Sequence, residues 1–258
     1  MSSDTRAIPE AAAGRLEWRV ASVVDLLDET PRARTIVLDV PQWPGHRAGQ
    51  HIDVRLVAED GYQAQRSYSI ASPPEEHSLA ITVERLDDGE VSPYLVEELR
   101  RGDGLEIRGP IGGYFVWDVA VGGPLLLVAG GSGIVPLMAM LRRHARAEPS
   151  VRATVPVRLL YSVRAPDDVI YRAELEQLTD PPGVELVLTF TREAPLTWTG
   201  YRRRIDRAML ETVSWPPSAE PHAYVCGPTE FVESAASLLV ELGHAASRVR
   251  TERFGATG

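Results

Sequence analysis

Lysine is missing from this sequence. All 27 basic residues among its 258 are arginines, and 36 acidic residues outnumber them. The net charge of −9 argues against a general affinity for nucleic acid. The exclusive use of arginine matters locally, because a planar guanidinium binds phosphate in a two-pronged geometry that lysine cannot copy. The arginines are therefore the first candidates for anion recognition.

Cysteine is almost absent as well. Cys226 is the single cysteine of this sequence. The sequence therefore cannot form an internal disulfide or supply, by itself, an all-cysteine zinc or iron–sulfur site. The six histidines do not fall at the paired spacing of metal ligands. We therefore expect no metal site.

Long apolar runs are also lacking. Runs such as residues 124–129 are far too short to span a bilayer. Residues 1–14 contain no apolar core of signal-peptide length, and we interpret them as a flexible leader. The expectation is a cytoplasmic protein that does not bind membranes.

The first half of the chain has the pattern of an all-β domain. Short runs that favour strands are separated by clusters of Pro, Gly and Asp, which is typical of a sandwich or barrel. The runs cover residues 16–27, 34–40, 51–57, 66–71, 79–84 and 104–108. One helix is predicted over residues 93–100, directly after Ser92.

After Gly122 the pattern changes to alternating strands and helices. Such alternation predicts a parallel sheet with helices on both faces. Predicted strands cover residues 124–130, 157–163, 184–190, 222–227 and 248–254, and predicted helices 136–147, 170–178, 205–211 and 229–243. We place the domain boundary between residues 120 and 121.

Two stretches are candidates for binding phosphate. The first, "VAGGSGIVP", places Gly131 and Gly133 between a strand and a helix, where free N–H groups can bind a pyrophosphate. Pro136 stands where a dinucleotide fingerprint has its third glycine, and it suits the first turn of a helix. From this pattern alone, a purely structural turn remains an alternative.

The second stretch is "DDGEVSPYLVEEL". Gly89 gives the backbone room, and we expect Ser92 to cap a helix that has Pro93 at its first position. Unpaired N–H groups there would hold an anion. A plain capped helix without a ligand is the alternative.

A third stretch, "QRSYSIASPP", alternates like a strand but carries an arginine, a tyrosine and hydroxyls instead of apolar residues. Together with five other motifs it resembles the ferredoxin–NADP reductase family of flavoprotein oxidoreductases. The six motifs occur in the family's order: "RSYS" (66–69), "GEVS" (89–92), "GPIGGYF" (109–115), "GGSGIVP" (130–136), "CGP" (226–228) and "ERF" (252–254). The resemblance implies an antiparallel Greek-key β-barrel FAD domain over 15–120, followed by a doubly wound parallel-sheet NAD(P) domain over 121–258.

The resemblance also implies roles on the flavin side. Arg66 is expected to pair with the flavin pyrophosphate, Tyr68 to lie against the flavin, and Ser69 to hydrogen-bond near flavin N5. Ser67 belongs to the same motif and is also expected among the cofactor-binding residues. We expect Ser67 and Ile70 to turn toward the barrel. The remaining expected FAD contacts are Val83, Arg85, Gly89, Val91 and Ser92.

For the nicotinamide nucleotide, the resemblance implies a cradle of Gly131, Ser132 and Gly133, with Pro136 opening the helix. Cys226, Gly227 and Pro228 are expected to border the nicotinamide, and Glu252 and Phe254 to close the flavin side. We expect Ser69, Cys226 and Glu252 to act as positioning and electrostatic groups in catalysis. For Cys226 the alternative is a small buried residue at a strand end.

Discrimination between NADPH and NADH depends on the groups near the adenosine ribose. Ser162 and Arg164 end one strand without an acidic residue, and Arg192 and the run Arg202–Arg204 follow the next. The pattern is similar to that of NADP-preferring members, although Arg204 replaces their tyrosine. We expect a preference for NADPH over NADH, with a solvated arginine cluster as the alternative.

The function implied is transfer of hydride from NAD(P)H to FAD and of electrons to a separate acceptor, such as a ferredoxin or an oxygenase component. One alternative is a reductase of free flavin or quinone, and another is a non-catalytic electron-transfer subunit of a larger complex. An acidic acceptor protein would need a local patch of arginines on this protein for docking. Candidates by family position are Arg32, Arg34, Arg47, Arg100 and Arg101.

Overall fold

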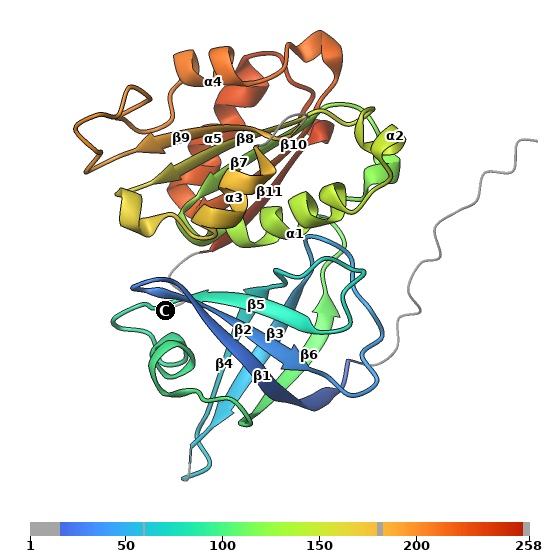
Figure 1. Cartoon of the computed structure of the whole chain (residues 1–258), viewed down its shortest axis with the longest axis vertical. Coiled ribbons are helices and arrows are strands. Elements are labelled where there is room, and N and C mark those ends of the chain that lie inside the picture. The colour runs from blue at the N-terminus through green and yellow to red at the C-terminus, as the bar shows by residue number, and fades with distance from the viewer. Residues whose placement is uncertain (1–15, 59, 180–182, 255–258) are drawn as a thin grey trace, which may run out of the picture.

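The computed structural model describes residues 16–58, 60–179 and 183–254. The predicted leader, 1–14, lies outside the described residues. The described chain forms an antiparallel sheet followed by a parallel sheet. Helix α1 (Ile134–Ala145) lies on the side of the parallel sheet that faces the antiparallel one (Figure 1).

The antiparallel sheet has six strands in the order β4-β3-β6-β1-β2-β5. Their bounds are Trp18–Thr30 (β1), Ala33–Asp39 (β2), His51–Val57 (β3), Gln63–Ser69 (β4), Leu79–Glu84 (β5) and Gly104–Ile111 (β6). A bridge between Ile70 and Ile81 connects the two edges of the sheet and closes it into a barrel. Because β6 returns to lie between β3 and β1, the predicted antiparallel Greek-key barrel is confirmed.

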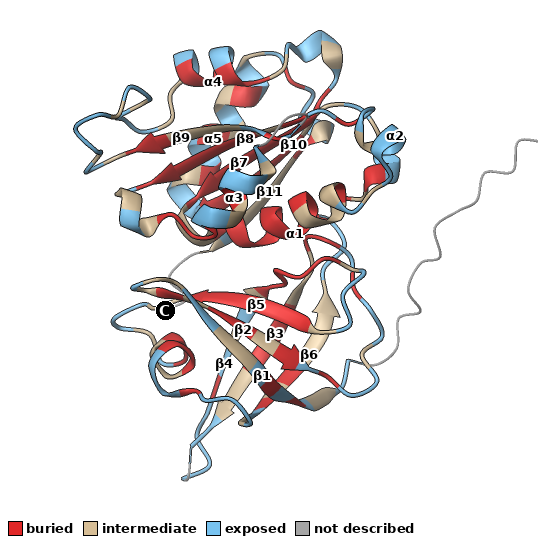
Figure 2. Cartoon of the chain, in the orientation of Figure 1, coloured by how far each residue is buried: buried red, intermediate tan, exposed pale blue. Residues whose placement is uncertain are grey.

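The barrel interior is filled by alternate residues of its strands. Ile36 and Leu38 on β2, and Ile52 and Val54 on β3, are fully buried (Figure 2). This is the period of two that a strand with one face in a core requires. These side chains belong to a single apolar cluster that fixes the barrel as a rigid support.

The helix predicted over residues 93–100 is a single π-helical turn, Tyr94–Glu98. Ser92 does not cap it, since the Ser92 hydroxyl accepts a hydrogen bond from the Leu86 N–H at 3.0 Å and no side chain caps the turn. The predicted Ser92 cap, with Pro93 as the first helical residue, is therefore wrong. Ser92 instead closes the loop that contains Gly89.

The parallel sheet has five strands in the order β11-β10-β7-β8-β9. These are Leu125–Gly130 (β7), Val157–Val163 (β8), Glu185–Phe190 (β9), His222–Pro228 (β10) and Val249–Phe254 (β11). The helices after α1 are Pro149–Arg152 (α2), Arg172–Leu178 (α3), Arg207–Val213 (α4) and Thr229–Glu241 (α5).

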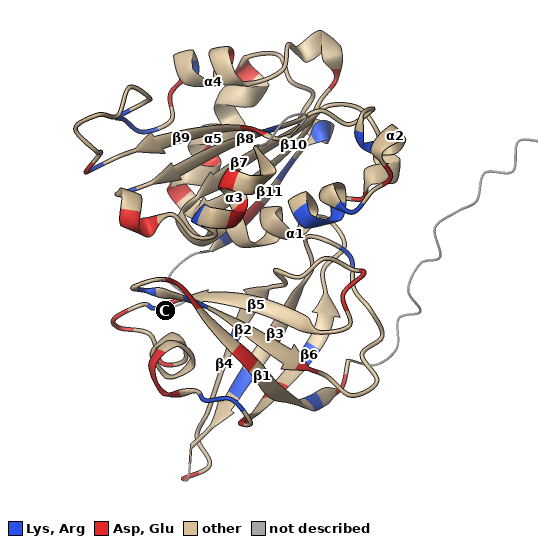
Figure 3. Ribbon diagram, viewed as in Figure 1, with Lys and Arg blue, Asp and Glu red and all other residues tan. Residues whose placement is uncertain are grey.

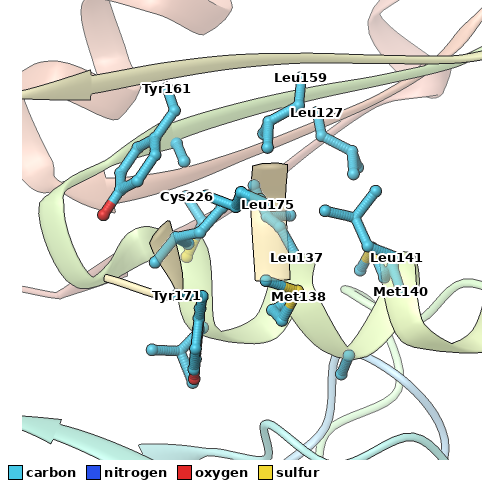
Figure 4. Packing of buried hydrophobic residues seen from close by; sticks show 14 of the residues in the cluster. Leu127, Leu137, Met138, Met140, Leu141, Leu159, Tyr161, Tyr171, Leu175 and Cys226 are labelled. Atoms are coloured by element: carbon cyan, nitrogen blue, oxygen red, sulfur yellow. The ribbon is translucent and has the colours of Figure 1, made fainter. Parts of the chain in front are cut away.

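Strand β7 is buried along its whole length, which explains its run of apolar residues. Leu125 and Leu127 pack in one cluster with α1 and α3, whereas Leu126 and Val128 pack in another with α4 and α5. Figure 4 shows the first cluster, in which Leu127 and Leu159 of the sheet face Leu137 and Leu141 of α1. Helices on both faces confirm the predicted doubly wound domain.

Arginines of α1 connect this domain to the barrel. The Arg142 guanidinium donates a hydrogen bond to the Ala71 carbonyl oxygen at 2.8 Å. Arg143 of α1 and Arg146, the residue after the helix, form ion pairs with the barrel: Arg143–Glu75 at 2.8 Å, and Arg146–Glu76. Figure 3 shows basic residues in blue toward this end of α1. These contacts fix how the two domains meet.

The segment between β6 and β7 contains a short 3₁₀ turn, Val119–Val121. We propose this turn as the domain boundary, with the barrel domain ending at residue 120.

Candidate functional site

Three strand ends meet where the barrel faces the parallel sheet. Ser69 is the last residue of β4, and Cys226 on β10 is paired in register with Glu252 on β11. The Ser69 hydroxyl donates to Glu252 Oε1 at 3.5 Å, a long and weak hydrogen bond. The structure therefore brings together Ser69, Cys226 and Glu252, which are 183 positions apart at the extremes. We call these three residues the seam.

Burial controls the protonation of the seam. Desolvation raises the pKa of Glu252 to about 7, and the hydrogen bond from Ser69 opposes this rise. The second carboxyl oxygen of Glu252 is buried and has no hydrogen-bond partner among the described residues. Burial, and then the nearby Glu252 carboxylate, raise the pKa of the Cys226 thiol well above its ordinary value. Cys226 is therefore a neutral thiol and lacks the thiolate character of an activated nucleophile.

Replacing Glu252 by glutamine should change how stability depends on pH. A carboxyl whose pKa is near 7 when folded and 4.5 otherwise binds protons more tightly in the native state, so wild-type stability falls as pH rises through this window. At pH 8 the Glu252→Gln protein should be more stable by up to about 3 kcal/mol, and the difference should shrink toward pH 5. Denaturant unfolding at both pH values measures it; an equal difference at pH 5 and pH 8 would show that Glu252 titrates normally.

On the barrel side, Arg66 and Tyr68 lie two residues apart on β4 and therefore face the same side of the strand. The Arg66 guanidinium donates to Glu90 at 2.8 Å, and the Tyr62 hydroxyl donates to the same carboxylate at 2.9 Å. Glu90 belongs to the "GEVS" segment, so the structure joins two of the motifs expected to hold the flavin. Burial raises the pKa of Tyr68, which stays protonated.

Ser67 does not turn toward the barrel interior as predicted, whereas Ile70 is fully buried. Ser67 is exposed and its hydroxyl donates to Asp53 at 2.7 Å. Asp53 in turn pairs with Arg108 at 2.7 Å. Because β-strand residues alternate between faces, Ser67 lies on the face opposite Arg66 and Tyr68.

The other expected flavin contacts fall into two groups. Val83 and Val91 have side chains buried in the barrel core, so only their backbone atoms are available to a ligand. The Arg85 guanidinium pairs with Glu97 and, at 2.9 Å, with Asp87. Its buried Nε has no hydrogen-bond partner.

A cleft of about 470 Å³ opens at the carboxyl ends of the parallel strands, where ligands bind in sheets of this type. Gly131, Ser132, Ser162 and Pro228 line it, as predicted for a nucleotide site. The barrel also contributes to its wall through Thr30, Arg32, Ala33 and Glu84. Pro228 lies two residues after Cys226, so the cleft leads to the seam.

The two glycines of the turn have distinct tasks. Gly131 has a φ of +54°, a left-handed conformation that glycine adopts most readily. A β-carbon at Gly133 would lie 2.1 Å from the Cys226 carbonyl oxygen, so glycine is needed for α1 to approach β10. Gly133 therefore provides the close helix–strand contact that a third glycine gives in the ordinary fingerprint. Pro136 is the third helical residue, not the first, and still lies in the first turn, where its missing N–H costs no hydrogen bond.

The predicted arginine cluster divides in two. Arg164 lines the cleft, as does Arg204, which the sequence analysis treated as a departure from the family pattern. Arg202 does not line the cleft, because its guanidinium donates to carbonyl oxygens of the loop before it, at 2.8 Å for Trp198. Arg192 is also absent from the lining. We propose Arg204, alongside Arg164, for the nucleotide site, and the role of Arg202 stays a prediction.

Phe231 is a lining residue that the sequence analysis missed. Its ring lies against Gly130 and Gly227 at the ends of β7 and β10. The available signal was an aromatic residue on the first turn of the helix that follows "CGP". On the far side of the seam, Phe254 ends β11 in register with Pro228 and packs against the core.

The arginines suggested for docking an acceptor are largely held by neighbours on the barrel. The contacts are Arg32 with Asp87 at 3.1 Å, Arg34 with Asp28 at 2.6 Å, Arg101 with Asp25, and Arg100 with the carbonyl oxygens of Glu97 and Leu99. Their role in docking stays a prediction.

The barrel, the nucleotide cleft and the seam together have the two-domain architecture of flavoprotein oxidoreductases. Residues 28–116 match the oxidoreductase FAD-binding domain, and residues 127–237 match the oxidoreductase NAD-binding domain. Ferredoxin–NADP reductase B of Sorangium cellulosum is 33% identical over 216 residues, which are 80% of this chain and 84% of that protein. The chain belongs to the ferredoxin–NADP reductase family.

Two other relatives indicate how this fold is used. The glycine betaine monooxygenase reductase subunit of Chromohalobacter salexigens is 34% identical over 91% of this chain, and the chain spans 63% of that subunit's length. The crystal structure of Amycolatopsis cytochrome P450 reductase GcoB is similar with a TM-score of 0.79 and 26% identity, covering 96% of this chain and 74% of that one. In the part of the chain that the structure describes, no helix is both long and apolar enough to cross a membrane.

Proposed function

We propose that this protein oxidises NAD(P)H with a bound FAD and passes the electrons to a separate redox protein. The observation that carries the proposal is the seam, which places Ser69 of the barrel beside Cys226 and Glu252 of the nucleotide domain. When bound, FAD supplies the chemistry, because it accepts hydride and releases single electrons. The protein contributes binding, orientation and electrostatics.

The residues present suit the flavin. Arg66 already binds a carboxylate in this structure, so its guanidinium is exposed enough and correctly turned to pair with a phosphate. Its position beside the "GEVS" segment supports a pyrophosphate site, which favours FAD over FMN. Tyr68 gives a protonated aromatic surface next to it, and Ser69 gives a hydroxyl at the domain seam.

The residues of the nucleotide domain suit a dinucleotide. Gly131 and Ser132 present backbone to the cleft, while Gly133 lets α1 begin against β10. Cys226 is fully buried and does not line the cleft, so its proposed role is that of a small neutral residue behind the nicotinamide site. The buried carboxyl of Glu252, with its unpaired oxygen and a pKa of about 7, can hold or release a proton at the seam near neutral pH.

Arg164 and Arg204 support a preference for NADPH, since both line the cleft and can pair with a 2′-phosphate. The Arg204→Ala protein should have a KM for NADPH raised about tenfold or more, with its KM for NADH changed less than about twofold.

Arg202→Ala is the matched control for Arg204→Ala, because Arg202 is two positions away but bonded to its own loop. It should leave both KM values close to wild type. If Arg202→Ala raises the KM for NADPH and Arg204→Ala does not, then Arg202 and not Arg204 binds the 2′-phosphate, and our assignment is wrong.

For the acceptor, the relatives offer the main support. The Chromohalobacter salexigens relative is named as the reductase subunit of a monooxygenase, and a Rhizobium meliloti relative as the reductase subunit of stachydrine N-demethylase. We therefore propose an oxygenase component or a ferredoxin-like carrier as the acceptor, with the protein in the cytoplasm.

The test is a comparison of acceptors under NADPH. Purified protein, after identification of its released flavin, is assayed with a plant-type ferredoxin, free FMN, a quinone and ferricyanide. Turnover with the protein carrier well above that with FMN or quinone supports the proposal. Turnover with FMN or quinone alone supports a reductase of diffusible acceptors. No turnover with ferricyanide under either NADPH or NADH contradicts an oxidoreductase.

A further inference from the structure

Tyr171 is a buried side chain that the chemistry above does not use. It lies between β8 and α3, it is 2% exposed, and its backbone has a φ of +59°. A bulky residue in this left-handed conformation is uncommon and persists only where the surroundings hold it. Figure 4 shows its ring beside α1, with the hydroxyl oxygen pointing away from the parallel sheet.

The Tyr171 hydroxyl reaches across the domain boundary. It forms a hydrogen bond with the hydroxyl of Thr82, a buried residue of barrel strand β5. Thr82 is also hydrogen-bonded to the Thr35 hydroxyl at 2.7 Å, and Thr35 donates to Glu29 at 2.7 Å. A carboxylate only accepts, so each hydroxyl donates toward Glu29 and Tyr171 is the first donor of the chain. Polar groups in such a buried chain reinforce one another.

A second contact attaches the Tyr171 ring to the barrel segment that follows β4. The Arg142 guanidinium carbon lies 4.9 Å from the ring centroid, within the range of a cation–π contact. The same guanidinium donates to the Ala71 carbonyl oxygen at 2.8 Å and to both oxygens of Glu174, at 2.8 and 2.6 Å. Each of the three guanidinium nitrogens of Arg142 therefore donates a hydrogen bond, and these bonds hold the guanidinium against the ring.

Both attachments lead directly to the site. Ala71 lies two residues after Ser69, and Thr82 lies two residues before Glu84 of the cleft wall. On the nucleotide side, Asp168 and Ile170, which precede Tyr171, also line the cleft. Tyr171 thus joins the wall of the nucleotide cleft to β5 and to the segment directly after β4, both of which are next to flavin-side residues.

We propose that Tyr171 is a positioning residue that holds the nucleotide domain against the barrel at the separation and angle that hydride transfer requires. The proposal rests on the function proposed above. Tyr171 is not proposed to touch the nicotinamide or the flavin. It acts through Thr82 and Arg142, and a small loss of alignment between the domains is sufficient to slow the reaction, since 1 Å of misplacement can cost about a hundredfold in rate.

The test uses FAD-loaded Tyr171→Phe, which keeps the ring and its contact with Arg142 and removes only the hydroxyl. On anaerobic mixing with NADPH, the rate of flavin reduction should fall about tenfold, and the long-wavelength nicotinamide–flavin charge-transfer absorbance should fall to less than half. FAD content and the dissociation constant of NADPH should change less than about threefold. Wild-type absorbance and rate in this variant would overturn the proposal.

Tyr161→Phe is the matched control. It removes another buried tyrosine hydroxyl, whose partner at 3.4 Å, the Ile170 N–H, lies within the nucleotide domain. It should keep the charge-transfer absorbance and the reduction rate within about twofold of wild type. If Tyr161→Phe loses as much charge-transfer absorbance and reduction rate as Tyr171→Phe, Tyr171 has only a general structural role and the proposal is overturned.

Thr82→Val removes the same hydrogen bond from the barrel side, which keeps the test open if Tyr171→Phe folds poorly. Thr82→Val also removes the hydrogen bond to Thr35, so it should slow flavin reduction at least as much as Tyr171→Phe. The double variant should be no slower than Thr82→Val alone, because the bond between Tyr171 and Thr82 is already lost in that variant. Additive effects would contradict a shared bond.

Hydrogen exchange in the FAD-loaded, nucleotide-free protein separates this proposal from the proposed function. Tyr171→Phe should speed amide exchange both in β5 and in residues 168–172, whereas Tyr161→Phe should leave β5 unchanged. Unchanged β5 exchange in Tyr171→Phe would refute the link even if NADPH reduces the flavin. If the wild type is not reduced at all, the proposed function fails, and the exchange result still decides whether the link exists.

Discussion

Replacing Arg66 by alanine should weaken FAD binding about a hundredfold without unfolding the protein. The guanidinium can give the pyrophosphate two charge-assisted hydrogen bonds, each contributing roughly 1.5–3 kcal/mol. Its removal also leaves the Glu90 carboxylate, now its partner at 2.8 Å, without a cation and close to the phosphate site. The side chain is 37% exposed, so its loss opens no cavity in the core.

Arg55→Ala is the control for this experiment. Arg55 lies on the neighbouring strand β3, forms an ion pair of similar length with Glu106 at 2.7 Å, and stacks on Trp18 instead of facing the "GEVS" segment. Titration of the flavin-free proteins with FAD, followed by flavin fluorescence, gives the dissociation constants. Equal losses in both variants, or none in Arg66→Ala, would remove Arg66 from the FAD site.

Replacing Gly133 by alanine should damage both the nucleotide domain and its cleft. The added methyl group would lie 2.1 Å from the Cys226 carbonyl oxygen, and no side-chain movement can relieve a contact with backbone. Strand β10 and the start of α1 must separate, at a cost of about 3 kcal/mol, the upper part of the range for overpacking. We expect the melting temperature to fall by roughly 10 °C and NADPH binding to weaken by about tenfold or more, because the cradle moves with the helix.

Gly113→Ala provides the comparison, since a β-carbon at Gly113 meets no atom within 4 Å. It should melt within about 2 °C of wild type. If Gly133→Ala is equally harmless, the close approach of α1 to β10 is not a requirement of the fold.

Much of the fold was predictable because it depends on local periodicity. Alternation within the barrel strands and the buried run of β7 each reflect a burial pattern that the sequence carries directly. The glycine turn was predictable because its backbone requires glycine. Gly131 has a positive φ, and a β-carbon at Gly133 would collide with the backbone of Cys226.

Local patterns are least informative where a side chain has more than one partner to choose from. Ser92 has the composition of a cap, but its hydroxyl accepts from Leu86 across a loop. Arg202 and Arg204 are the same residue type two positions apart, and only the three-dimensional loop decides that one binds carbonyl oxygens and the other faces the cleft.

Contacts between the domains could not be predicted from local patterns at all. Tyr171 and Thr82 are 89 positions apart, and Arg142 and Ala71 are 71 apart. Neither pair has a characteristic spacing in sequence. The seam itself was found only through the resemblance, because Ser69 and Glu252 carry no local mark of their proximity.

Anaerobic stopped-flow mixing of the FAD-loaded protein with NADPH tests the central claim most directly. The account predicts rapid loss of the oxidised-flavin absorbance, preceded by a transient long-wavelength absorbance as nicotinamide meets flavin at the seam of Ser69, Cys226 and Glu252. An oxidised-flavin spectrum that persists with saturating NADPH, and equally with NADH, would contradict it.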